Sequence, residues 1–345
     1  MRPAFFIGCW RLGATPLAMS PHFPDAELEK IIEAAGAKVV LKEGQDLSGE
    51  PLWSGSYCIS PRFKALTSGG STGLPKVVVD TAPSVVDIEA NTWRWGWTEG
   101  PALFAPGPTF HSGPITHMTE GLARGLHFIT MRKFDAQKAV ELINKHRPHW
   151  AMFVPTMMNR ILKLPPEVLA SSDFSCFKYL WHSAATCPAW LKQEWIDLVG
   201  AEAVWEIFGG SEGTASTIIN GAEWLEHKGS VGRCNFGEIA IFDESGKASP
   251  NGVVGEIYMR NLVIAPRFKI SGQVKRRMIG EWESFGDLGW VDDDGYLYLA
   301  DRRVDDDRLW HALLSVRHPR TRNCQGAGLE QQFRVRGVLR GTVDQ

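Results

Sequence analysis

The sequence predicts an α/β protein with sheets and flanking helices, and with a β-rich part toward its C-terminal end. Three observations predict this fold class. The chain has 345 residues, 44% hydrophobic and 22% charged, which suffices for a large core and about two domains. Helix-like and strand-like patterns alternate along residues 24–213. From about residue 229, short alternating strands joined by glycine turns take over.

The first predicted α/β step spans residues 24–41, PDAELEKIIEAAGAKVVL. Acidic residues in the first turn and a stop at Gly36 predict a helix, and the β-branched run after it, around Val39, predicts a strand. In residues 63–80, FKALTSGGSTGLPKVVVD, a Gly/Ser/Thr loop separates two further strands. This loop is the strongest local signal in the chain.

The alternation continues through the centre of the chain. A strand in GPALFAPGPTFHSGP (100–114) runs into a Pro/Gly turn, and AQKAVELINKHRPHWAMFVP (136–155) predicts a helix and a buried strand. KYLWHSAA (178–185) predicts a strand that ends in small residues, PAWLKQEWIDLVG (188–200) a helix, and AVWEIFGGSEG (203–213) a strand that ends in a glycine loop. Polar loops therefore collect at strand ends, where open α/β sheets build their binding crevices.

Three regions follow from these patterns: an α/β portion at 1–228, a β-rich subdomain at 229–300 and a tail at 301–345. Ser-Gly, Asn-Gly and Asp-Gly turns join the strands of the middle region. The tail has nine Arg, six acidic residues and no Lys, with poor periodicity. It is expected to be solvated or loosely folded rather than an arm that binds RNA or phosphate.

Composition also excludes several function classes. The net charge of -2 provides no global positive field, so no nucleic-acid partner is expected. No apolar run is long enough to span a bilayer, and Arg11 and Gly13 interrupt the start of the chain, which argues against a secretory signal. Six scattered cysteines without a CxxC pair fit neither a zinc site nor a disulfide scaffold. A cytoplasmic protein with a small-molecule or nucleotide ligand is expected.

The loop Thr67–Lys76, TSGGSTGLPK, has the groups that hold a polyphosphate: hydroxyls, unhindered backbone N–H groups and one ammonium. It differs from the GxxxxGK[ST] loop, because no Ser or Thr follows Lys76. A flexible linker would explain its Gly and Ser residues but not its Pro-Lys ending.

This loop resembles the phosphate loop of the AMP-forming adenylating superfamily, which includes acyl-CoA synthetases, peptide-synthetase adenylation domains and luciferases. Further segments match in the family's order, so the resemblance covers most of the chain: Phe110-His111, Ser183-Ala184-Ala185, Phe208-Gly209-Gly210-Ser211-Glu212-Gly213, Gly286-Asp287-Leu288-Gly289 and Asp301-Arg302. It implies the large N-terminal domain of an adenylate-forming enzyme, α/β sheets with helices plus a β-rich subdomain, incomplete here.

The resemblance also implies roles for individual residues. The implied catalytic residues are Thr72, Lys76, His111 and Glu212, with Glu212 as a ligand of Mg²⁺. The implied nucleotide-binding residues are Thr67, Ser68, Gly69, Gly70, Ser71 and Gly73 at the phosphates, Ser183, Ala184, Ala185 and Phe208 at adenine, Gly209 in the same motif as Phe208, Ser211 at the α-phosphate, Asp287 at the ribose, and Arg302 at the ribose and phosphate. Phe208 replaces the family's usual Tyr and Ser211 its Thr, which keeps a stacking face and a hydroxyl.

Each matched segment has a structural alternative when it is taken by itself. His111 follows a Pro/Gly turn, where a histidine is commonly a structural hydrogen-bonding group. Small residues at 183–185 also suit tight packing between strand and helix, and Glu212 also fits a solvated loop carboxylate.

The implied activity is ATP-dependent conversion of a fatty, aromatic or bile acid to an acyl adenylate, followed by thioester formation with coenzyme A. An inactive nucleotide-binding remnant and an adenylate-forming amide ligase stay open as alternatives. Relative to the family, the chain is expected to be truncated at both ends. The family's late catalytic Lys is therefore expected to be absent, since no lysine follows Lys275.

Overall fold

The computed structural model describes residues 3–42, 45, 55–68, 76–89, 95–210, 213–261, 268–271 and 277–302. Contacts divide the chain into Met1–Arg303 and Val304–Gln345, and the second unit lies outside the described residues. The predicted boundary at 228/229 stays a prediction based on composition.

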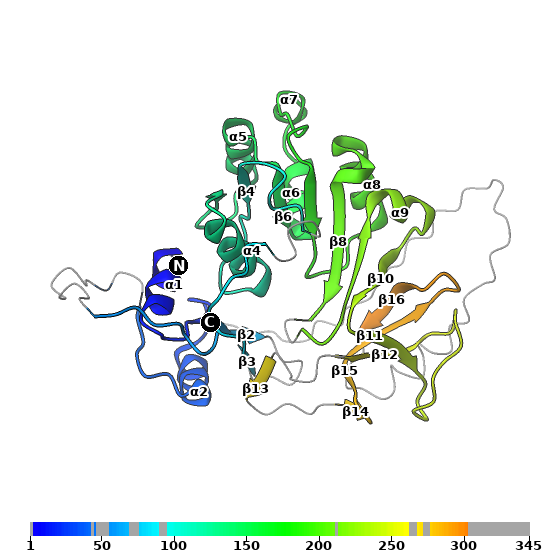
Figure 1. The fold of residues 1–345 in the computed structure, drawn as a ribbon. Coiled ribbons are helices and arrows are strands. Elements are labelled where there is room, and N and C mark those ends of the chain that lie inside the picture. The colour runs from blue at the N-terminus through cyan, green and yellow to red at the C-terminus, as the bar shows by residue number, and fades with distance from the viewer. Residues whose placement is uncertain are drawn as a thin grey trace, which may run out of the picture. The chain divides into compact units, whose positions relative to one another are not determined.

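Helices and strands alternate through the first two thirds of the chain (Figure 1). The helices are α1 (Pro3–Arg11), α2 (Asp25–Ala35), α4 (Ser112–Ala123), α5 (Ala136–His146), α6 (Pro155–Leu162), α7 (Pro166–Ala170), α8 (Ala189–Val199) and α9 (Gly221–Glu226), with a 3-10 turn at Ala201–Ala203. The strands up to the glycine loop are β1 (Leu17–Ala18), β2 (Lys64–Ser68), β3 (Lys76–Asp80), β4 (Ala102–Phe104), β5 (His127–Ile129), β6 (Trp150–Phe153), β7 (Tyr179–His182) and β8 (Val204–Gly209). The later strands are β9 (Ser216–Asn220), β10 (Ser230–Phe236), β11 (Glu238–Phe242), β12 (Gly255–Arg260), β13 (Phe268–Ser271), β14 (Arg277–Ile279), β15 (Trp282–Val291) and β16 (Tyr296–Arg302).

The described strands form two sheets. The smaller has the order β1-β2-β3-β13, and the larger has the order β11-β12-β15-β16-β10-β9-β8-β7-β6-β4-β5, with β14 paired to β15. Strands β5, β4, β6, β7 and β8 run parallel, whereas every pairing from β8 to β11 is antiparallel. The α/β fold class predicted from the sequence is therefore confirmed.

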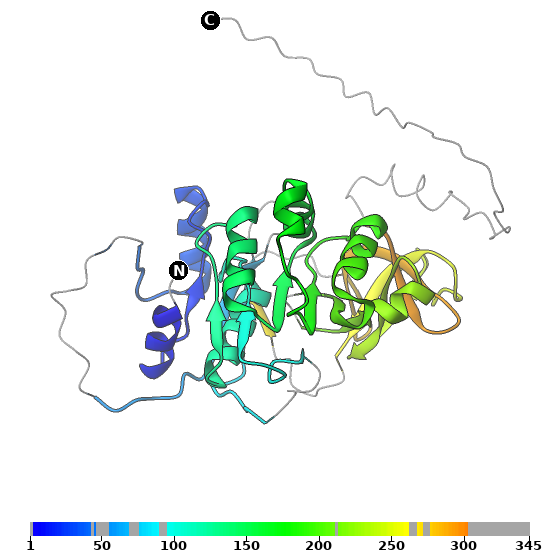
Figure 2. The ribbon, with the colours of Figure 1, turned by 90° about the horizontal axis from the view of Figure 1, so that it is seen from above.

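The parallel strands are buried on both faces. On one face, Phe104 and Phe153 pack against α5, α6 and α8 through residues such as Ile143 and Trp195. Figure 2 shows these helices beside the strands. On the other face lies a second cluster that includes Trp97, Trp150 and Trp181. Burial on both faces explains why these strands appear in the sequence as nearly continuous apolar runs.

The smaller sheet has its own helices. Ile31 of α2 packs on Ala65 and Val77, and Phe6 of α1 packs on Leu66. Helix α2 ends as predicted, because Gly36 takes the left-handed conformation (φ 61°) that glycine adopts without a steric penalty.

The strand predicted around Val39 is wrong. Residues 39–41 form no strand, and Val39 is 75% exposed. β-branched residues favour a strand only where a pleated, half-buried surface receives them, and this segment has no such surface among the described residues.

Five of the described helices, α1, α4, α6, α7 and α9, were not predicted. Helix α4 contains Gly113, Pro114 and Gly121, which are poor helix formers, and it is stabilised instead by burial of Ile115 and Met118 in the core. No helix within the described ranges has the length and apolar character that crossing a bilayer requires.

Candidate active site

Two of the predicted nucleotide-binding segments lie side by side. Strands β7 and β8 are parallel neighbours, with His182 opposite Glu206. The chain leaves β7 at Ser183, and β8 continues through Phe208 to Gly209. Both segments therefore lie at the carboxyl ends of neighbouring parallel strands, which is where ligands bind in open α/β sheets.

The segment after β7 is exposed to solvent. Ala184 and Ala185 are exposed, and Ser183 is partly exposed. Ala184 has a φ of 72°, a left-handed conformation that costs a non-glycine residue roughly 1–2 kcal/mol. Strain of this kind collects at functional sites, where the surrounding structure holds it in place.

A buried charged network lies beneath these strand ends. Lys192 of α8 donates to Glu206 of β8 at 2.7 Å, and the two side chains are only 1% and 8% exposed. The His182 Nε2 atom lies 3.8 Å from the same carboxylate. The Lys192 ammonium also lies over the Trp224 ring. The network ties helix α8 to the two strands that end at the predicted adenine site.

Sequence reasoning missed this network, although a signal was present. Glu206 interrupts an otherwise apolar strand, VWEIF, and Lys192 lies on the buried side of α8 with Leu191 and Trp195. A charge on a buried face needs a partner, because an unpaired buried charge is very costly.

Burial sets the protonation states in this region. It lowers the pKa of His182 to about 4, with Lys192 acting in the same direction and Glu206 opposing it. Neither ring nitrogen of His182 has a hydrogen-bond partner among the described residues. Burial also raises the pKa of the nearby Cys187 thiol to about 12, with Glu206 adding to the effect. His182 is therefore neutral and Cys187 protonated near pH 7.

The predicted phosphate loop connects two paired strands. Thr67 lies opposite Val77, and Ser68 lies opposite Lys76, so the loop leaves and re-enters the sheet at facing positions. The structure does not describe the central residues of this loop, Gly69, Gly70, Ser71, Thr72 and Gly73, nor the side chains of Ser68 and Lys76. Their assignment stays a prediction.

His111 immediately precedes helix α4, and this helix packs on the strand that leads into the phosphate loop. The Lys64 ammonium of β2 donates to the Thr116 hydroxyl at 2.5 Å, and Leu66 packs on Ile115. The His111 ring lies 4.7 Å from that of Phe110, and partial desolvation lowers its pKa. A neutral imidazole therefore precedes the helix that packs on β2, the strand before the predicted phosphate loop.

The predicted ribose-binding residues are cross-strand partners. Asp287 of β15 lies opposite Arg302 of β16 in the antiparallel ladder. Asp287 is partly exposed, and the side chain of Arg302 lies outside the described residues. Strands β10 and β9 separate this pair from β8 in the sheet.

The structure thus brings predicted residues together in two groups. These are Ser183–Ala185 with Phe208 and Gly209, at the ends of neighbouring parallel strands, and Asp287 with Arg302. Ser211 and Glu212, which follow the first group in sequence, lie outside the described residues.

Two named ligases are similar to this chain in sequence. A long-chain-fatty-acid–CoA ligase of Mycobacterium tuberculosis, FadD13, is 26% identical over 341 residues, which cover 87% of this chain and 66% of the relative. The 4-coumarate-CoA ligase 1 of Narcissus pseudonarcissus is 27% identical over 345 residues, 86% of this chain and 63% of the relative. The chain therefore spans less than two thirds of the length of either relative.

A solved structure shares the fold. The o-succinylbenzoate CoA synthetase of Bacillus subtilis, in complex with its acyl-adenylate intermediate, superposes with a TM-score of 0.71 at 19% identity, over 87% of this chain and 66% of the other. The model of the AMP-binding enzyme family matches residues 65–267, which include the predicted phosphate loop and the ends of β7 and β8. On this match, the chain belongs to the AMP-binding enzyme family.

Proposed function

We propose that this protein acts as an AMP-forming acid–thiol ligase, which joins a carboxylic acid to coenzyme A with ATP. The observation that supports the proposal is the parallel pairing of β7 with β8, because Ser183–Ala185 and Phe208 follow the last paired residues, His182 and Glu206, of these neighbouring strands. Relatives named as long-chain-fatty-acid–CoA and 4-coumarate-CoA ligases support this class of activity. A cytoplasmic location, where ATP and coenzyme A are both available, is part of the proposal.

The adenosine of ATP is proposed to lie at the strand ends. The exposed backbone at Ala184 and Ala185 offers a flat surface for the base, and the Phe208 ring offers a face for stacking. Asp287 is proposed to accept hydrogen bonds from the ribose hydroxyls, with Arg302 beside it for the phosphate, since a guanidinium suits phosphate oxygens.

The phosphates are proposed to lie in the loop between β2 and β3. The residues that line this loop are Thr67, Ser68, Gly69, Gly70, Ser71 and Gly73. Thr72 and Lys76 stabilise the departing pyrophosphate. Glu212 would hold Mg²⁺, since a carboxylate suits this hard ion, which when bound offsets phosphate charge. Gly209 and Ser211 lie next to the α-phosphate in this arrangement.

The reaction then proceeds in two substitutions. A carboxylate oxygen of the acid attacks the α-phosphorus in line, the bond to the β-phosphate oxygen breaks, and pyrophosphate leaves. The thiol of coenzyme A, after losing its proton, attacks the acyl carbon of the adenylate, and AMP leaves. His111 lines the acyl pocket in this proposal, and its lowered pKa keeps it uncharged beside an apolar acid.

The test is ATP–pyrophosphate exchange that depends on an added carboxylic acid, measured across fatty, aromatic and steroid acids. Lys76→Ala and Glu212→Gln are expected to abolish the exchange. Lys145→Ala on α5 and Glu194→Gln on α8 change exposed residues of the same types and are expected to keep it.

The nucleophile in the second step is tested separately. Coenzyme A and a panel of amines are offered to the same protein, and the product is identified as a thioester or an amide. Exchange followed by amide formation alone would replace the proposal with an amide ligase. A folded protein that binds ATP without any exchange would leave only a nucleotide-binding function.

A further inference from the structure

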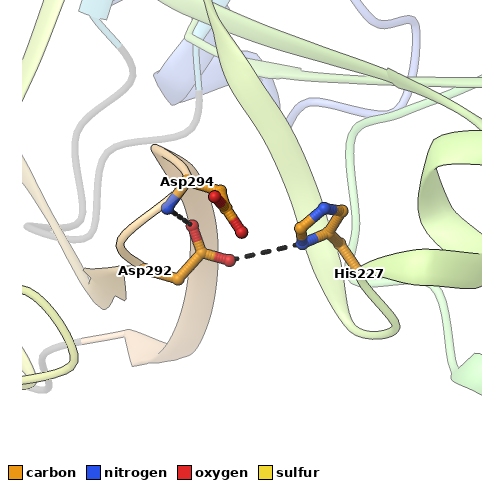
Figure 3. A group of neighbouring side chains, drawn as sticks. All are labelled: His227, Asp292 and Asp294. Carbon is orange, nitrogen blue, oxygen red and sulfur yellow. Dashed lines mark hydrogen bonds and ion pairs between the residues drawn. The ribbon is translucent and has the colours of Figure 1, made fainter.

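Three potential metal ligands converge at the turn between β15 and β16, at the opposite end of this hairpin from the Asp287–Arg302 pair. They are His227, which follows helix α9, and Asp292 and Asp294 of the turn (Figure 3). One nitrogen or oxygen atom from each lies within 4.8 Å of the other two. We propose that this cluster, named here the turn site, binds a divalent transition-metal ion such as Zn²⁺.

His227 and Asp292, the two partly buried ligands, are spaced as two ligands of one metal ion are, and not as a direct ion pair is. The Nδ1 atom of His227 lies 3.4 Å from the Oδ2 atom of Asp292. A charge-assisted hydrogen bond between such groups is typically about 2.7–2.9 Å long. Two ligands on a tetrahedral ion with bonds of about 2.0–2.1 Å are instead separated by about 3.4 Å.

Neighbouring groups already hold His227 and Asp292 in position. The His227 ring stacks on Tyr296 at 3.7 Å between centroids. The Oδ1 atom of Asp292 accepts backbone N–H groups of Asp294 and Tyr296, and its Oδ2 atom accepts the Tyr298 hydroxyl at 3.0 Å. Outer contacts of this kind orient metal ligands and raise affinity.

Charge and access also favour an ion at this place. Residues 292–294 are three consecutive aspartates, whose mutual repulsion a bound dication would relieve. Asp294 is exposed, so its carboxylate can turn toward the other two ligands, and the side chains of His227 and Asp292 retain 19% and 20% exposure. An imidazole with two carboxylates is a donor set for Zn²⁺ or Co²⁺, whereas Mg²⁺ prefers oxygen ligands alone.

The test is calorimetric titration of the chelator-treated full chain with Zn²⁺ in the absence of ATP. One equivalent is expected to bind, with no competition from equimolar Mg²⁺. Asp294→Asn is expected to weaken binding at least tenfold, and His227→Gln to abolish it. Asp293→Asn is the matched control, because Asp293 lies in the same turn but accepts from Asn251 outside the cluster.

Titration with Co²⁺ separates the turn site from the cysteines. Thiolate ligation would produce a sulfur-to-cobalt charge-transfer absorption, which nitrogen and oxygen ligands do not. The proposal is overturned by the absence of Zn²⁺ binding, by equal effects of Asp293→Asn and Asp294→Asn, or by a thiolate absorption that accounts for the bound ion. Because Asp294 is exposed, its variant is expected to fold, which circular dichroism checks.

Discussion

The Lys192 ammonium lies 2.7 Å from the Glu206 carboxylate, and both side chains are buried beneath the ends of β7 and β8. Burial lowers the pKa of Lys192, and the carboxylate opposes this effect. The pair therefore stays charged only while both members are present. It joins helix α8 to the strand that leads to Phe208.

Replacing one member of this pair is expected to destabilise the fold. Lys192→Met leaves Glu206 as an uncompensated buried charge and should lower the free energy of unfolding by about 3–5 kcal/mol. The double variant Lys192→Met with Glu206→Leu should recover much of this loss, because apolar pairs can replace buried ion pairs. Urea unfolding followed by tryptophan fluorescence measures both. Equal loss in the single and double variants would show that packing, not charge, is responsible.

Acid is expected to destabilise the protein through His182. Its pKa is about 4 in the folded chain against an ordinary 6.5, so the unfolded chain binds more protons between these values. The stability that neutral His182 contributes is complete above about pH 6.5 and falls as the pH drops toward 4, by at most about 3 kcal/mol. His182→Leu should flatten this part of the profile. His117, with a pKa of about 3, remains in the variant, so the difference between the two profiles isolates His182.

Backbone strain at Ala184 predicts opposite effects for two neighbouring substitutions. Ala184→Gly should stabilise the protein by about 0.5–1 kcal/mol, because glycine relieves a left-handed conformation that costs alanine about 1–2 kcal/mol. Ala185→Gly has no such strain to relieve and should destabilise by about 0.4–1 kcal/mol through the unfolded chain. Thermal unfolding of the two variants shows whether each substitution raises or lowers the stability. A loss of stability in both would mean that the surroundings do not hold Ala184 under strain.

Ribose binding at Asp287 is testable with a modified nucleotide. Asp287→Asn should weaken ATP binding by about 10-fold to 100-fold, since hydrogen bonds to a charged group contribute about 1.5–3 kcal/mol. The effect should be smaller with 2′-deoxy-ATP, which has already lost one of the hydroxyls. Fluorescence titration measures the affinity of ATP and of 2′-deoxy-ATP for the unchanged protein and for Asp287→Asn. The same weakening for ATP and 2′-deoxy-ATP would argue against a contact with the 2′-hydroxyl.

Much of the architecture could be predicted because the signals are local. The stop of α2 at Gly36, the strands on both sides of the phosphate loop and the alternation through β8 follow from side-chain periodicity and glycine. The strand around Val39 was predicted wrongly for the same reason. Local propensity favoured a strand, but a strand also requires a neighbour that the sequence pattern does not specify.

The sequence by itself determined which residues are available for chemistry: the Thr67–Lys76 loop, the small residues after β7, the glycine loop after β8, and Asp287 and Arg302. Only the tertiary structure decided which of them meet. The register between β7 and β8 sets His182 opposite Glu206 and so makes the ends of these two strands neighbours. The register between β15 and β16 sets Asp287 opposite Arg302. The Lys192–Glu206 pair and the turn site also depend on contacts between separate elements. Such contacts arise from burial and strand pairing over the whole chain, and local periodicity does not encode them.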